Sequence, residues 1–149
     1  MSVPYAKLPA WADYGLVPLI NLAVAFLVAG LVVMLIVVAS IQWLGHSVYP
    51  PPEGLDFRDK DAVAAAMASA PVGALGFVLL SYAVATFLAA GTAATISLRH
   101  KCAVAIVIGA VMLVLAAISL LALPHPTWMI VAGLLLPLPV ALLGWRVFR

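Results

Sequence analysis

Hydrophobic residues in this chain are gathered into four long stretches that contain no charged side chain. The stretches are Leu16–Leu44, Pro71–Leu98, Ala103–Leu123 and Thr127–Trp145. As α-helices rising about 1.5 Å per residue, all four are long enough to cross a hydrocarbon core about 30 Å thick. The pattern predicts an all-α protein: an integral membrane four-helix bundle in which residues 1–149 form a single transmembrane domain.

Composition places the chain outside the range of soluble domains. Of its 149 residues, 67% are hydrophobic and 8% are charged, whereas a soluble protein of this size exposes far more charge. The formal net charge of +2 is too small to indicate nucleic-acid binding. The predicted partner is therefore the lipid bilayer, with a membrane-protein partner or a homo-oligomer as further alternatives.

Charge is distributed unevenly between the predicted loops. Basic residues occur in the link Arg99-His100-Lys101, at Arg146 and Arg149, and at Lys7. In the loop after the first stretch, two cations are outnumbered by four acidic residues, Glu53, Asp56, Asp59 and Asp61. The positive-inside rule counts Lys and Arg, and it predicts that both termini and the second loop are cytoplasmic.

The four tryptophans lie at the ends of the apolar stretches. By position along the chain, Trp11 and Trp145 mark one membrane interface, and Trp43 and Trp128 mark the other. Tryptophan is enriched at membrane–water interfaces, so these positions agree with the predicted orientation.

The acidic loop also contains a segment that favours a helix. Asp59-Lys60-Asp61 is followed by an alanine-rich run to Ala70, and aspartate suits the first turn of a helix. A helix from Ala62 to Leu98 would be too long for one span, and Pro71 supplies the break. We therefore expect a short extramembrane helix before the second span.

Small residues on the second span form a candidate helix-packing face. Ala85, Ala89 and Ala93 fall four residues apart and so share one side of a helix. Close packing of small residues drives helix association in lipid. Packing within the bundle is the favoured interpretation, and binding of a second copy or another subunit is the alternative.

Two prolines near the middle of the fourth span predict a kink. Pro137 and Pro139 lack a backbone N–H, so the carbonyls of Gly133 and Leu135 lose their helical donors. Gly133 would also relieve crowding by the Pro137 ring. In a bilayer the freed carbonyls need other donors, for which the candidates are water, Ser81, Thr86 and Ser119. A structural kink is favoured over a gating hinge or a lipid pocket.

One set of polar residues gathers on the predicted extracytoplasmic side. His46 follows the first span and His125 precedes the fourth, and the candidate polar site is completed by Tyr49, Asp56 and Trp128. Two imidazoles and a carboxylate could bind a transition metal or supply a general base. The histidines have no metal-site spacing, however, so we assign no metal ligand and favour separate positions at the headgroup boundary.

The spans contain no ionisable side chain, although such residues mark ion pathways and proton relays in membrane proteins. Small multidrug transporters have a similar four-span length but need a buried carboxylate, so we do not expect proton-coupled transport by this chain alone. No phosphate-binding loop, activated nucleophile or metal motif is present. The sequence therefore predicts no catalytic residue, no enzyme activity and no cofactor.

Three segments are distinctive enough to suggest a family. They are Gly45-His46 with Tyr49-Pro50-Pro51-Pro52-Glu53-Gly54-Leu55-Asp56, then Pro71–Leu75, and His125-Pro126-Thr127-Trp128. With them the chain resembles, from about Ile41 to Arg146, a group of uncharacterised bacterial small four-span membrane proteins. The resemblance implies a multi-pass protein of the bacterial inner membrane and implies no activity. This chain departs from the group in a longer N-terminal lead-in and in Ala85, Ala89 and Ala90, where the group is richer in glycine.

These observations favour a non-catalytic accessory or structural subunit of the membrane. The alternative is a component that binds or transports a lipid, a quinone or a metal at an extracytoplasmic site formed by His46 and His125. That alternative predicts a cavity between the first and fourth spans, with both imidazoles near a common point.

Overall fold

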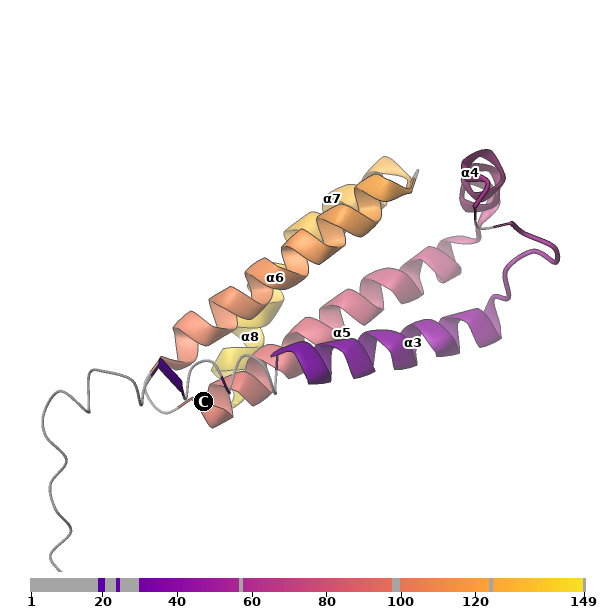
Figure 1. The fold of residues 1–149 in the computed structure, drawn as a ribbon. Coiled ribbons are helices and arrows are strands. Elements are labelled where there is room, and N and C mark those ends of the chain that lie inside the picture. The colour runs from indigo at the N-terminus through magenta and orange to yellow at the C-terminus, as the bar shows by residue number, and fades with distance from the viewer. Residues whose placement is uncertain are drawn as a thin grey trace, which may run out of the picture.

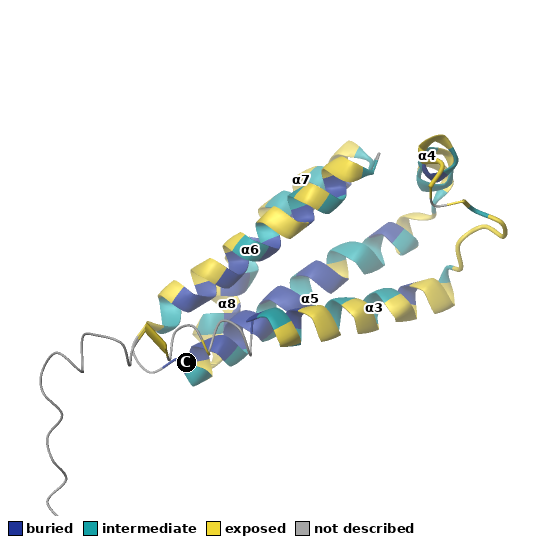
Figure 2. Cartoon of the chain, viewed as in Figure 1, coloured by how far each residue is buried: buried dark blue, intermediate teal, exposed yellow. Residues whose placement is uncertain are grey.

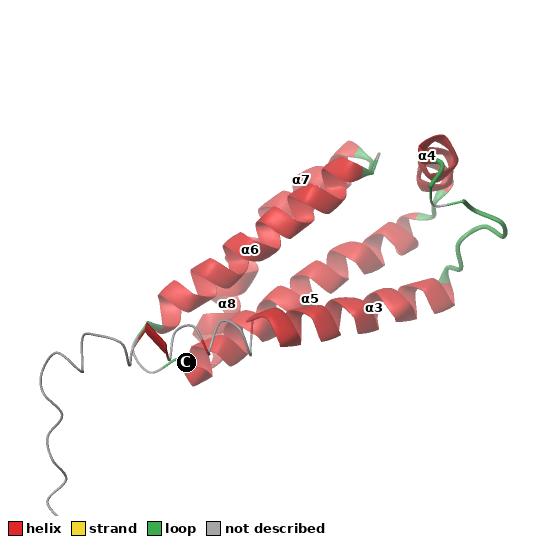
Figure 3. Ribbon diagram, in the orientation of Figure 1, coloured by secondary structure: helices red, strands yellow, loops and turns green. Residues whose placement is uncertain are grey.

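The computed structural model describes residues 19–20, 24, 30–56, 58–97, 100–123 and 125–148, and these residues contain helices and loops but no strand (Figure 3). The helices are α3 (Met34–Val48), α4 (Lys60–Ser69), α5 (Val72–Ile96), α6 (Lys101–Ala122), α7 (Thr127–Leu135) and α8 (Pro137–Phe148). Four helical segments within the described ranges are long and apolar enough to cross a membrane: Gly30–Val48, Val72–Ile96, Lys101–Ala122 and Thr127–Phe148. The predicted all-α class with four membrane-length helices is confirmed, while most of the predicted first span before Gly30, and Trp11, lie outside the described residues.

The first span ends later than the sequence analysis placed it. Helix α3 continues four residues beyond Leu44, so His46 lies within the helix and does not follow it. Nothing between Gly45 and Val48 stops a helix, whereas a residue before proline is driven out of the α-helical conformation. Tyr49 precedes Pro50 and has φ −126° and ψ 79°, which ends the helix.

The predicted short helix before the second span is present as α4. Asp59 caps it, because its side-chain Oδ1 accepts from the backbone N–H groups of Asp61 at 2.9 Å and Ala62 at 3.2 Å. The helix stops at Ala70, the residue before Pro71, and α5 begins immediately afterwards. Figure 1 looks nearly along the axis of α4 but shows α3 and α5 from the side, so α4 lies across the end of the bundle.

Helix α5 is the centre of the fold. It packs against α3, α6, α7 and α8, and α3 packs substantially only against α5 among the described helices. Ala85, Ala89 and Ala93 are completely buried, and Figure 2 shows dark blue running along α5. The candidate packing face is therefore covered by other parts of the same chain.

Helices α5 and α8 approach so closely that their backbones touch. A Cβ atom on Gly144 would overlap the carbonyl oxygen of Phe87, and one on Gly91 would lie 2.6 Å from the Phe148 ring. The rings of Phe87 and Phe148 meet edge to face with centroids 5.7 Å apart. Glycine thus allows very close contact on the side of α5 that carries Phe87 and Gly91, a different side from the alanine face.

The fourth span is interrupted at Leu136, between α7 and α8. Leu136 N–H still donates to the Ala132 carbonyl at 3.0 Å, and Val140 N–H donates to the Leu136 carbonyl at 3.1 Å, so the gap in helical donors comes from the two prolines. Helix α5 packs extensively against α8 and only slightly against α7. The interruption therefore falls where the fourth span leaves α5.

Two expected donors for the freed carbonyls are used elsewhere. Ser81 Oγ donates to the Val78 carbonyl at 2.7 Å, and Thr86 Oγ1 donates to the Tyr82 carbonyl at 2.6 Å. The expectation that these hydroxyls reach across to the fourth span was wrong, because a helical hydroxyl has an acceptor within reach in its own preceding turn. Gly133 instead makes room for the side chain of Leu120 on α6.

Candidate functional site

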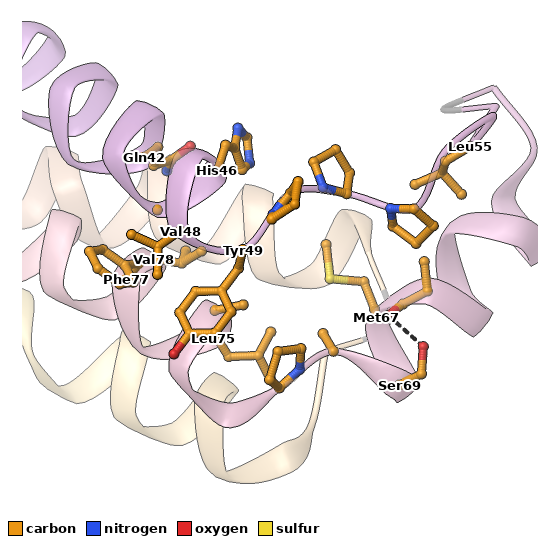
Figure 4. Close-up of a pocket in the computed structure, with 18 of the residues that line it drawn as sticks. Gln42, His46, Val48, Tyr49, Leu55, Met67, Ser69, Leu75, Phe77 and Val78 are labelled. Atoms are coloured by element: carbon orange, nitrogen blue, oxygen red, sulfur yellow. Dashed lines mark hydrogen bonds between the residues drawn. The ribbon is translucent and has the colours of Figure 1, made fainter.

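A cavity of about 620 Å³ lies at the end of the bundle that carries α4. Its walls come from the last turns of α3, the proline run 50–52, one side of α4 and the start of α5, with Leu123 contributed from the end of α6 (Figure 4). The lining is mostly apolar, and its members include Leu55, Met67 and Phe77. This is the size and character of a small-molecule site.

Two reciprocal contacts join the helices beside the cavity. Gly45 on α3 accommodates Phe77, since a Cβ on that glycine would lie 2.9 Å from the Phe77 Cβ, and Gly73 on α5 accommodates the ring of Tyr49. The two rings meet edge to face with centroids 6.1 Å apart. Each segment therefore supplies a glycine and, four residues later, an aromatic side chain that fills the glycine position of the other.

The polar side chains of the lining are those of Gln42, His46, Tyr49 and Ser69, and the other lining residues are apolar. The Ser69 hydroxyl is satisfied within α4, where it is within hydrogen-bond distance of the carbonyls of Ala65 at 3.0 Å and Ala66 at 3.1 Å. His46 is exposed, and Figure 4 shows its imidazole pointing away from the Tyr49 ring. The interior of the cavity is consequently apolar.

The structure does not assemble the predicted polar site. Of its five residues, His46 and Tyr49 line the cavity, while Asp56, His125 and Trp128 do not. Asp56 Oδ1 accepts from the backbone N–H of Arg58 at 2.9 Å, and Trp128 is 46% exposed on α7. The cavity described above lies between the first and second spans and not between the first and fourth, because α3 packs on α5 and the start of α7 lies well apart from the end of α3 (Figure 1).

His125 has a local role at the end of α6. Its Nδ1 lies 2.9 Å from the Leu123 carbonyl oxygen and 3.3 Å from that of Leu120, so it satisfies carbonyls that the end of a helix leaves without partners. Within the described ranges, no three His, Cys, Asp or Glu side chains are grouped so that they could hold a metal ion. The metal-binding form of the alternative therefore gains no support from the geometry.

Sequence reasoning missed the part played by Phe77, Gly73 and α4 in forming the cavity. A usable signal was present: Gly45 and Tyr49 are spaced four apart near the end of one span, and Gly73 and Phe77 are spaced four apart near the start of the next. Two antiparallel helices that are consecutive spans bring the end of one beside the start of the next, so each glycine can face the ring of the other pair.

The described residues form four helices long and apolar enough to cross a membrane, which suggests the class of multi-pass helical membrane proteins. Comparison with protein-family models, with curated proteins and with solved structures found no match to this chain.

Proposed function

We propose that this protein is a non-catalytic accessory or structural subunit of the bacterial inner membrane. The observation that carries the proposal is that, among the described helices, α3 packs substantially against α5 alone. In the most apolar part of the first span, Gly30–Val48, 11% of the residues are buried, whereas the corresponding share is 28–39% in the other three spans. The exposed residues of α3 include Leu35, Ile36 and Trp43. An apolar helix held on one side by α5 leaves a large face for a neighbouring membrane protein.

Co-purification tests the subunit proposal. The chain would be extracted at native expression level in a mild detergent, and everything that migrates with it would be identified by mass spectrometry. We expect a stoichiometric membrane-protein partner whose association is lost when Ile36 is replaced by Glu on the exposed face of α3. A chain that migrates alone under these conditions would refute the proposal.

The orientation proposed is cytoplasmic for both termini and extracytoplasmic for α4. The support is the charge asymmetry: Lys101 and Arg146 lie at the end opposite α4, whereas the acidic segment 53–61 leads into α4 and includes its first two residues. Cys102 is the single cysteine of the chain, and Cys102→Ser removes it. In that background, the cysteine introduced by Glu53→Cys should react with a membrane-impermeant maleimide in intact cells. If labelling occurs only after cell lysis, the acidic segment lies on the cytoplasmic side and the proposed orientation is wrong.

Binding of a small apolar ligand is a second candidate function, and the cavity beneath α4 favours it. This site replaces the His46/His125 pair as the proposed location. Its lining is apolar, and α4 crosses the end of the bundle beside it. A lipid or a quinone-sized molecule fits this description better than a metal ion does. Native mass spectrometry of the detergent-extracted chain, which retains bound small molecules, would test it.

A further inference from the structure

We infer that the cavity beneath α4 selects lipophilic organic cations over neutral or anionic molecules of the same size. The inference rests on the second candidate function, ligand binding, and adds the chemical class of the ligand. It is carried by three features: a mostly apolar lining without Asp, Glu, Lys or Arg, the C-terminal ends of three helices at the cavity, and an excess of carboxylates in the segment 53–61, whose Leu55 lines the cavity.

The helix ends supply a fixed negative potential. Helices α3, α4 and α6 all finish at the cavity, which Val48, Ser69 and Leu123 line at or beside their last residues. The C-terminal end of a helix is equivalent to roughly −0.5 of an elementary charge, and one N-terminal end, that of α5, opposes these three. The Nδ1 of His125 lies on the last carbonyls of α6, whereas the ends of α3 and α4 are capped by their own backbone.

Charge in the adjoining loop has the same sign. Leu55 lines the cavity between Glu53 and Asp56, and Val63 lines it two residues after Asp61. Arg58 and Lys60 are outnumbered by the four carboxylates of this loop, so its formal charge is −2. The lining carries no Lys or Arg, and its one imidazole, that of His46, is exposed and points away from the Tyr49 ring, so a bound cation meets no fixed positive side chain inside the cavity.

The apolar walls determine what kind of cation fits. A small hydrated ion would lose its water against Met67, Leu75 and Phe77 without gaining ligands, which is costly. A cation whose charge is spread over apolar groups avoids that cost, and the rings of Tyr49 and Phe77 can contact it through their faces. The predicted ligand therefore carries one delocalised or shielded positive charge on an apolar body.

Two isosteric ions provide the test: tetraphenylphosphonium is a cation, and tetraphenylborate is an anion of nearly the same shape. Binding of each to the full chain in phosphatidylcholine nanodiscs would be measured by equilibrium dialysis, with empty nanodiscs subtracted. We expect the cation to bind about tenfold more tightly than the anion, or better. Neutralising two of the four carboxylates of the segment 53–61, with Glu53→Gln and Asp61→Asn, should weaken cation binding about threefold while leaving the Asp59 cap in place.

Variants that fill the cavity locate the binding. Ala74→Phe on α5 and Ala66→Phe on α4 both add a ring to the lining, and each should abolish the selective binding of the cation. Ala110→Phe adds the same ring to the exposed side of α6 and should leave it unchanged. Two cavity variants are used so that a folding defect in one, detected by circular dichroism, still leaves a test.

The outcomes separate this inference from the function on which it rests. Equal binding of the two ions, lost on filling the cavity, would overturn the charge selectivity and retain the ligand site. Binding of neither ion above empty nanodiscs would overturn both. Selective binding that survives both cavity variants would overturn the assignment to this cavity.

Discussion

The two ends of the bundle are packed by different means. At the end away from α4, the backbones of α5 and α8 touch at Gly144 and Phe87, and α6 joins them where Gly109 meets Ala141. At the end beside α4, α3 and α5 touch through rings that fill glycine positions, and a cavity of about 620 Å³ adjoins the contact.

This difference separates a rigid part of the molecule from an adjustable one. Backbone against backbone leaves no atom that can rotate away, so any added volume must move a whole helix. A ring against a glycine can change its rotamer, and the Tyr49 ring belongs to the residue after the last turn of α3. We expect the α5–α8 end to determine stability and the α4 end to accommodate ligands.

The largest expected effect is at Gly144. Gly144→Ala places a Cβ against the carbonyl oxygen of Phe87, which cannot move without its helix, and should lower the free energy of unfolding by about 2–3 kcal/mol. Unfolding in mixed detergent micelles, followed by circular dichroism, measures it. Gly76→Ala is the matched control, since a Cβ there meets no atom within 4 Å. If Gly144→Ala and Gly76→Ala are equally stable, the α5–α8 end is not the more rigid end of the bundle.

A smaller loss is expected at Gly73. Gly73→Ala overlaps the Tyr49 ring, which can shift toward the loop, so the free energy of unfolding should fall by about 1–2 kcal/mol. Adding Tyr49→Ala removes the obstructing ring, and the double variant should then be more stable than the sum of the single changes predicts. Strict additivity in this cycle would show that the ring and the glycine do not interact.

Tyr82 lies near the middle of α5, between the two ends of the bundle, and Tyr82→Phe should lower the free energy of unfolding modestly. It removes the hydrogen bond that Tyr82 Oη donates to Ser119 Oγ across α5 and α6 at 3.1 Å. Hydrogen bonds between membrane helices contribute about 0.6 kcal/mol on average, and a loss of that order is expected. The same unfolding assay on Ser119→Ala and on the Tyr82→Phe/Ser119→Ala double variant should give a nonzero coupling free energy between the two residues. If the two changes in unfolding free energy simply add, the hydrogen bond does not contribute to stability.

His46→Ala should have the smallest effect on stability. The side chain is exposed at the end of α3, so the free energy of unfolding should change by less than about 0.5 kcal/mol. Blue-native electrophoresis should also show unchanged migration. A loss above about 1 kcal/mol would mean that His46 holds the loop to the bundle, and the α4 end would then be less adjustable than proposed.

Local signals predicted much of the fold. Asp59 and Pro71 predicted where α4 starts and ends, and Pro137 and Pro139 predicted that the fourth span is interrupted. These predictions succeeded because a cap or a proline acts on hydrogen bonds within a few residues. Long apolar stretches predicted four membrane-length helices in the same direct way.

The candidate site was harder to predict because it depends on which helices are neighbours. Sequence position indicates that the last turn of α3 and the first turn of α7 share an end of the bundle, but it does not give their positions around the bundle axis. His46 and His125 were therefore grouped, although α3 packs on α5 and His125 stays on the last carbonyls of α6. Hydroxyls such as Ser81 were assigned distant acceptors when their own helix supplied nearer ones.

The position of α8 in the chain has a consequence for the order of biosynthesis. Helix α8 forms the most extensive contact of α5, yet it is made after every other described helix. Until its residues leave the ribosome, Gly91 lacks the Phe148 ring and Phe87 lacks the backbone of Gly144. During synthesis the central helix therefore lacks its most extensive contact until α8, the last described helix, has been made.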